Sequence, residues 1–146
     1  MQLYSFFNSS TSYRVRIALA LKGLDYQVVP VNLRQGEQLR PADRQRNPTQ
    51  ALGIDAEDRQ RWYAHWVAEG LAAAETLLNR HRRGAFFAGA AAGIVECCLV
   101  PQLANARRMG CDLTPYPALL ELEGRCLALE AFQRASPERQ PDYLPD

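Results

Sequence analysis

Residues 3–23 read LYSFFNSSTSYRVRIALALKG, and this stretch decides how the first part of the chain folds. Residues 2–6 form a short apolar and aromatic run, which is typical of a buried β-strand. Residues 8–12 are rich in helix-capping types, and helical periodicity follows from Tyr13 onward. Gly23 is expected to end that helix, because glycine adopts the left-handed conformation that often follows a helix C-terminus.

A second apolar run, residues 26–33, completes a strand–helix–strand unit, whose two strands are usually parallel. In such a unit the serine-rich turn lies at a helix N-terminus, which presents unpaired N–H groups and a partial positive charge. A hydroxyl placed there can also donate a hydrogen bond to a thiolate, and both effects lower the pKa of a bound thiol. Helix capping alone is the commoner role of such a turn, so the motif by itself leaves both interpretations open.

The rest of the chain is predicted to be helical. Residues 34–54 are polar, with one short helix expected at 42–46. Asp55 can cap a long helix that has one apolar face and ends near residues 80–84. Residues 137–146 are expected to be loosely held. Further helices are expected at residues 93–109, 118–126 and 128–135, the first of them apolar on all sides and therefore fully buried.

The composition is that of an ordinary soluble globular chain, with 146 residues, 47% hydrophobic and 23% charged. This length allows one domain or two small ones. The formal net charge of +1 argues against a general attraction to nucleic acid or to a membrane surface. We expect no signal peptide and no membrane span, because the apolar runs are shorter than the ~20 residues that a spanning helix needs.

The four cysteines, Cys97, Cys98, Cys111 and Cys126, form no CxxC pair. We expect them to be reduced and buried in a cytoplasmic protein, and we expect no zinc site or other metal. Cys98 lies in an apolar run, which raises the pKa of a thiol, so it is expected to be chemically inert.

Residues 9–19 contain Ser-Ser-x-Ser-x-Arg-Val-Arg-Ile-Ala-Leu, which resembles the hallmark of zeta-class glutathione transferases. Bacterial members of that class are maleylacetoacetate isomerases and the related maleylpyruvate isomerases. The similarity continues over nearly the whole chain, in Asn47-Pro48 and in residues 26–33, 62–66, 97–102, 105–108, 112–117, 131–135 and 140–143. The resemblance implies an α/β plus all-α fold, mostly helical. A truncated thioredoxin-like βαβ unit at residues 1–50 would precede the helical C-terminal domain of a glutathione transferase at residues 51–146.

The resemblance also implies a function, which is the glutathione-dependent cis–trans isomerisation of maleylacetoacetate to fumarylacetoacetate in tyrosine and phenylalanine catabolism. Glutathione would be the cofactor and a small dicarboxylate the substrate. A cytoplasmic homodimer would be the working form, with no nucleic acid, membrane or metal partner. Maleylpyruvate isomerase and a non-catalytic remnant of the family are the alternatives.

Matching positions imply roles for individual residues. Ser9 would donate its hydroxyl to the glutathione sulfur, with Ser10 and Arg14 also in the catalytic set. Arg108 would bind a substrate carboxylate, because a planar guanidinium forms two parallel hydrogen bonds to that group; a solvated residue at a helix end is the alternative. Glutathione would be bound by Ser9, Ser10, Thr11, Ser12, Tyr13, Arg14 and Gln38.

One large departure from the family lies between Asn47-Pro48 and Leu52-Gly53, where only three residues remain. Family members carry there a cis-proline strand, a hairpin, an acidic-serine turn and a long helix. A two-stranded sheet is marginally stable, and the helix that begins at Asp55 loses its usual apolar partner. We therefore expect exposed apolar surface or rearranged packing, and both impaired activity and a gene-model error stay open. A smaller departure is Gly93, a weaker helix cap than the family's Thr or Ser, although Glu96 can still take the reciprocal capping position.

Overall fold

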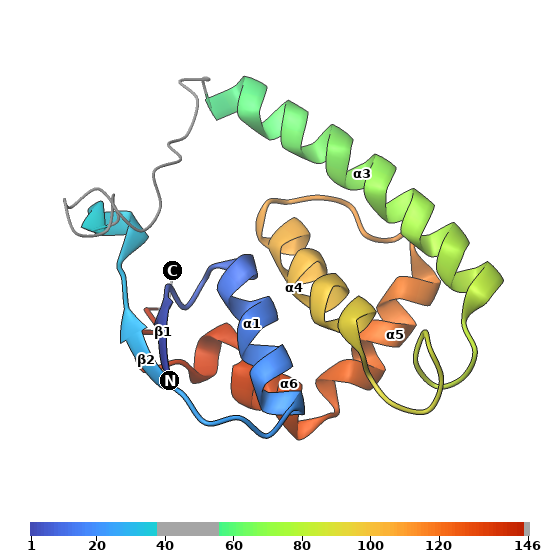
Figure 1. The fold of residues 1–146 in the computed structure, drawn as a ribbon. Helices are drawn as coiled ribbons and strands as arrows, with labels where there is room; N and C mark the ends of the chain where they lie inside the picture. Colours follow the sequence, from blue (N-terminus) through green and yellow to red (C-terminus); the bar gives the residue numbers. More distant parts are fainter. Residues whose placement is uncertain (38–55, 145–146) are drawn as a thin grey trace.

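The computed structural model describes residues 1–37 and 56–144 (Figure 1). Strand β1 (Gln2–Ser5), helix α1 (Ser10–Leu21) and strand β2 (Gln27–Pro30) form the predicted strand–helix–strand unit, and the strands are parallel as expected. The described residues do not include the short helix expected at 42–46, the cap at Asp55, or the boundary expected between two domains.

Local signals in the sequence set both ends of α1. The Ser9 side chain accepts a hydrogen bond from the Ser12 N–H at 3.2 Å, which caps the first turn. Gly23 has φ of 64°, in the left-handed region, and the next residue, Leu24, donates its N–H to the Leu19 carbonyl at 3.0 Å. This bond back across the last turn ends the helix where the sequence predicts.

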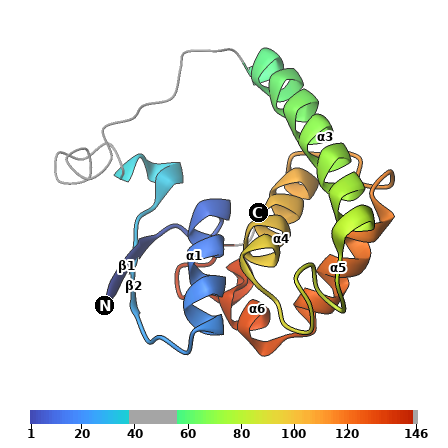
Figure 2. The same cartoon turned by 45° about the vertical axis from the view of Figure 1, so that its right-hand side comes forward.

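The prediction that the first strand is buried is wrong. Of its four residues only Ser5 is buried, and Tyr4 is 44% exposed. Both views place the two strands at the edge of the molecule (Figures 1 and 2). Within the described residues the sheet has these two strands alone, so no neighbouring strand covers their outer edge.

The helical half packs onto the strand–helix–strand unit through α1, which contacts α4 and α6 (Figure 2). Tyr13 and Ile17 of α1 belong to the same buried cluster as Leu103 and Phe132, so the described residues share one core. After the short 3₁₀ turn η1 (Leu33–Gln35), the elements of this half are α3 (Ala56–His81), α4 (Ile94–Arg108), α5 (Pro117–Leu127), α6 (Glu130–Ala135) and the 3₁₀ turn η3 (Pro137–Arg139).

A side chain of α3 caps the start of α5. The two carboxylate oxygens of Glu75 accept the N–H groups of Ala118 and Leu119, each at 2.9 Å. These N–H groups have no partner inside their own helix, and a carboxylate is favourable at a helix N-terminus. The contact fixes α3 against α5.

The apolar face shared by α3 and α4 is exposed, which confirms the expectation that follows from the missing segment. Trp62 and Trp66 are 64% and 56% exposed, and Ile94 is 75% exposed. The prediction that the helix at residues 93–109 is fully buried is therefore wrong on this side. Cys98 is also exposed, so the expectation that it packs inertly is wrong as well. Apolar composition predicts burial only where a neighbouring element is present to bury it.

The prediction of a loosely held tail is wrong for residues 137–144. After η3, the Gln140 side chain is buried and donates to the Ser136 carbonyl at 2.8 Å. Asp142 accepts the N–H of Phe7 at 3.0 Å, which ties the tail to the loop after β1. Polar and proline-rich composition indicates a loose tail only when nothing in the fold receives it.

Candidate functional site

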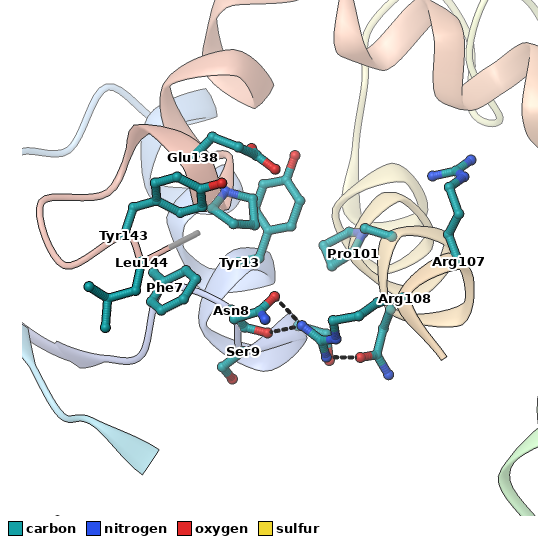
Figure 3. Close-up of a pocket in the computed structure, with 14 residues that line it drawn as sticks. Phe7, Asn8, Ser9, Tyr13, Pro101, Arg107, Arg108, Glu138, Tyr143 and Leu144 are labelled. Atoms are coloured by element: carbon teal, nitrogen blue, oxygen red, sulfur yellow. Dashed lines mark hydrogen bonds between the residues drawn. The ribbon is translucent and has the colours of Figure 1, made fainter. Parts of the chain in front are cut away.

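A cavity of about 420 Å³ lies where the N-terminus of α1, the C-terminal half of α4 and the tail converge (Figure 3). It brings together Ser9, which caps α1, and Ser10, the first residue of α1, with the predicted substrate ligand Arg108. Its other walls include Phe7, Asn8, Tyr13, Pro101, Asn105, Glu138, Tyr143 and Leu144.

Ser9 performs the capping role that its turn suggests, yet its hydroxyl retains a hydrogen. The Oγ atom accepts the Ser12 N–H, and a serine hydroxyl has one donor besides two acceptor lone pairs. The first turn of α1 itself contains no acidic residue, although Glu138 of the tail lines the same cavity. The cavity wall at Ser9 therefore suits an anion that accepts a hydrogen bond.

Arg108 is fixed across the cavity by two asparagines. Its Nη1 donates to the Asn8 carbonyl at 2.6 Å and also contacts Asn8 Oδ1, while Nη2 donates to Asn105 Oδ1 (Figure 3). Asn105 in turn donates through Nδ2 to the Tyr63 hydroxyl of α3 at 2.5 Å. A guanidinium has five donors, so this network orients Arg108 and leaves donors for a carboxylate.

The neighbouring Arg107 has a different role. It makes a two-point ion pair with Glu123 of α5, with distances of 3.1 and 2.6 Å. This hydrogen bonding raises the pKa of Arg107, whose side chain points away from Arg108 in Figure 3. Of the two adjacent arginines, Arg108 is the one that contacts Asn8, in the turn that precedes α1.

The other predicted residues lie in different surroundings. Tyr13 lines the cavity but is buried, and burial raises the pKa of its phenol to about 12. Arg14 instead donates to Gln102 Oε1 at 3.1 Å and lines a separate apolar groove between α3 and α4. Thr11 and Ser12 do not line the described cavity, and Gln38 lies outside the described residues.

Asn8 and Asn105 are cavity residues that sequence reasoning missed. Asn105 lies three positions before Arg108 on a helix, a spacing that puts two side chains on one face, so this neighbour could have been found. Asn8 reaches Arg108 across 100 residues of sequence, and no local pattern indicates that contact.

Within residues 1–37 and 56–144, none of the helices has the length and apolar character needed to cross a bilayer. The same part of the chain has no group of three or more His, Cys, Asp or Glu side chains placed to hold a metal ion.

Comparison with known proteins places the chain in a family. Residues 1–52 match the N-terminal domain of glutathione S-transferases. The mouse protein maleylacetoacetate isomerase is 32% identical, with 96% of this chain and 94% of the relative covered. The crystal structure of maleylpyruvate isomerase from Pseudomonas aeruginosa PAO1 has a TM-score of 0.80 and 66% identity, with 99% of this chain and all of that chain covered. Maleylacetoacetate isomerase from Anaeromyxobacter dehalogenans, solved with glutathione in its active site, has a TM-score of 0.80 and 31% identity. The match covers 98% of this chain and 97% of that chain.

The alignment with the mouse protein also reports on the missing segment. It spans 203 positions, whereas this chain has 146 residues, so the relative carries a long stretch with no counterpart here. The alignment, at 32% identity, nevertheless reaches across 96% of this chain and 94% of the relative. The chain therefore belongs to the family of maleylacetoacetate isomerases, the zeta class of glutathione transferases.

Proposed function

We propose that this chain is a glutathione-dependent isomerase that converts maleylacetoacetate to fumarylacetoacetate. The observation that carries the proposal is the convergence of Ser9, at the N-terminus of α1, and Arg108, at the end of α4, on one cavity. The family relationship supports the same reaction class, because the relatives are named maleylacetoacetate or maleylpyruvate isomerases.

The described residues fit the thiolate end of glutathione. A thiolate in the cavity would lie near the positive end of the α1 dipole and could accept the free hydrogen of the Ser9 hydroxyl. Both interactions favour the charged form of sulfur and so lower the pKa of a bound thiol. Ser10, the first residue of α1, adds a second hydroxyl at the same wall.

Bound glutathione would supply a thiolate that adds to the cis double bond, allows rotation about the resulting single bond and departs to leave the trans isomer. Ser9 and the N-terminus of α1 stabilise the negative charge on sulfur before addition and after departure. Arg108 holds a carboxylate of the substrate, while Asn8 and Asn105 fix the plane of its guanidinium. The reacting carbon is thereby kept beside the sulfur throughout the rotation.

The test is glutathione-dependent conversion of maleylacetoacetate by the purified chain. The variant Ser9→Ala should lower kcat by about tenfold near neutral pH, because losing the donor to the thiolate raises the pKa of the bound thiol by about one unit and reduces its ionised fraction. The control Thr76→Ala removes an exposed hydroxyl that bonds within α3, and should leave the rate unchanged. A wild-type rate no higher than that of Ser9→Ala would refute the proposal and favour the alternative that the chain is a non-catalytic remnant of the family.

Maleylpyruvate is a second candidate substrate. It is favoured by the 66% identity to the structure named maleylpyruvate isomerase, compared with 32% identity to the mouse maleylacetoacetate isomerase. Both substrates present a cis double bond next to a carboxylate, so the same Ser9 and Arg108 pair serves either. Measuring kcat/KM for the two substrates with one enzyme preparation decides between them.

The proposal includes a homodimer in the cytoplasm. The exposed apolar face around Trp62, Trp66 and Ile94 supports self-association, because soluble monomers seldom expose large apolar patches. Four free cysteines support a reducing compartment. Light scattering at several protein concentrations tests the dimer, and a monomer at all of them would contradict it.

A further inference from the structure

The C-terminal tail holds the loop from which Ser9 projects. The N–H of Phe7 donates to Asp142 Oδ2 at 3.0 Å, although the two residues are 135 positions apart. The ring of Tyr143 packs edge-on against the ring of Phe7, with centroids 5.4 Å apart (Figure 3). The tail therefore contacts both the backbone and the side chain of one loop residue.

The opposite side of Phe7 is held by a second charged group. Arg16, which is completely buried, donates from Nη2 to the Phe7 carbonyl at 3.0 Å. Its Nε donates to the Ala135 carbonyl at 2.8 Å, which ties it to the end of α6. Both polar groups of the Phe7 backbone are thus bound by charged side chains, one from the tail and one from α1.

Fixing Phe7 in this way constrains Ser9. Peptide groups are planar, so a hydrogen bond on each side of Phe7 orients the two peptide planes that flank it. The following turn closes when the Ser9 N–H donates to the Phe6 carbonyl at 3.0 Å. Few backbone torsions remain free between the held peptide planes and the Ser9 hydroxyl.

Asp142 lies in a segment that is held by hydrogen bonds, and one of its two carboxylate oxygens has no hydrogen-bond partner among the described residues. The neighbouring Gln140 side chain is anchored to the carbonyls of Ser136 and Arg134, and the Tyr143 N–H donates to the Gln140 carbonyl at 3.1 Å. Within the described residues, the second oxygen of Asp142, Oδ1, is buried without a hydrogen-bond partner. A buried oxygen without a hydrogen-bond partner lowers stability, so the position of Asp142 calls for an explanation other than stability.

We propose that Asp142 is a positioning residue that holds the Phe7 amide and thereby aligns the Ser9 hydroxyl with the sulfur of glutathione. This inference rests on the proposed function, since it gives the contact between Asp142 and Phe7 a role in binding the glutathione thiolate at Ser9. Asp142 acts through Phe7 and does not itself line the cavity.

The first test needs no ligand. In Asp142→Ala, amide hydrogen exchange at Phe7 and Ser9 should accelerate by at least about tenfold, the factor expected when a charge-assisted hydrogen bond is lost. Exchange in α4 and α5 should not change. Asp142→Asn keeps an acceptor oxygen for the Phe7 amide and should stay close to wild type, while Asp25→Ala removes an exposed carboxylate and serves as the control. Unchanged exchange at Phe7 and Ser9 in Asp142→Ala overturns the proposal.

The second test follows the thiolate of bound glutathione by its ultraviolet absorbance as pH is varied. Asp142→Ala should raise the apparent pKa of that thiol and lower kcat with little change in the KM for substrate, and Asp142→Asn should restore both. A loosened loop with an unchanged thiol pKa overturns the positioning role. If the wild-type protein binds no glutathione, the proposed function fails and the positioning role with it, and the exchange data then report on the contact separately.

Discussion

Replacing Arg16 with methionine removes three hydrogen bonds and keeps an unbranched side chain of similar length. The three acceptors are the Ser5 hydroxyl at 3.0 Å, the Phe7 carbonyl at 3.0 Å and the Ala135 carbonyl at 2.8 Å. They lie in β1, in the loop before Ser9 and at the end of α6, so Arg16 joins the sheet to the helical half. Its side chain is fully buried, and water cannot replace the lost donors without opening the core.

The magnitude follows from what the substitution leaves behind. A buried acceptor without a partner costs about 1–3 kcal/mol, so the two carbonyls together cost about 2–6 kcal/mol. The Ser5 hydroxyl can rotate and adds little. Burial also lowers the pKa of Arg16, because removing the guanidinium from water is unfavourable, and methionine relieves that penalty. We therefore expect the free energy of unfolding to fall by about 3 kcal/mol.

The assay is urea unfolding followed by far-ultraviolet circular dichroism, which reports on the helices. Trp62 and Trp66 are already exposed, so fluorescence is the poorer probe here. The control is Arg125→Met, because Arg125 forms an exposed pair with Glu121 one helical turn away and such pairs contribute little. A loss for Arg16→Met no larger than that of the control would refute the reasoning.

Three further predictions concern capping, pH and thiol reactivity. Gly93→Thr should raise the free energy of unfolding by about 0.5–1 kcal/mol by adding a cap and restricting the unfolded chain, since Glu96 already accepts the Gly93 N–H at 2.7 Å; a lower Tm would contradict this. Burial raises the pKa of Tyr13 to about 12 from an unfolded value near 10, so between these pH values the unfolded chain loses its proton first and stability falls as pH rises. The wild-type protein should therefore lose about 1 kcal/mol of stability through Tyr13 as pH rises to about 11, and Tyr13→Phe should not show this loss. Chemical unfolding that gives wild type and Tyr13→Phe the same pH dependence would contradict this. In the native protein a thiol reagent should modify exposed Cys98 well before buried Cys126, whose pKa burial raises to about 12, and mass spectrometry showing the reverse order would refute this.

The sequence predicts the features that depend on neighbours along the chain. The Ser9 cap and the Gly23 turn bound α1 as expected, because capping and left-handed turns are set by a few adjacent residues. The resemblance to a family predicts Ser9 and Arg108 as site residues, and the structure brings both to one cavity.

Contacts between distant segments could not be predicted from the sequence. Arg16 bonds Ala135 across 119 positions, and Phe7 bonds Asp142 across 135, so no periodicity indicates either contact. A charged residue normally indicates a solvated surface, and Arg16 departs from that rule because three acceptors surround it. Ile94 shows the opposite error, since its apolar side chain indicates burial but has no covering element in the described part of the chain.

The measurement that tests the central claim most directly is the pKa of the glutathione thiol in complex with this chain. Ultraviolet absorbance of the thiolate, recorded across pH at saturating protein, should give a value at least about one unit below that of an ordinary thiol near 8.5. Ser9→Ala should move that pKa back toward the ordinary value. A thiol pKa that is unchanged by the wild-type protein, or equal in wild type and Ser9→Ala, would contradict the claim that the α1 turn holds a glutathione thiolate.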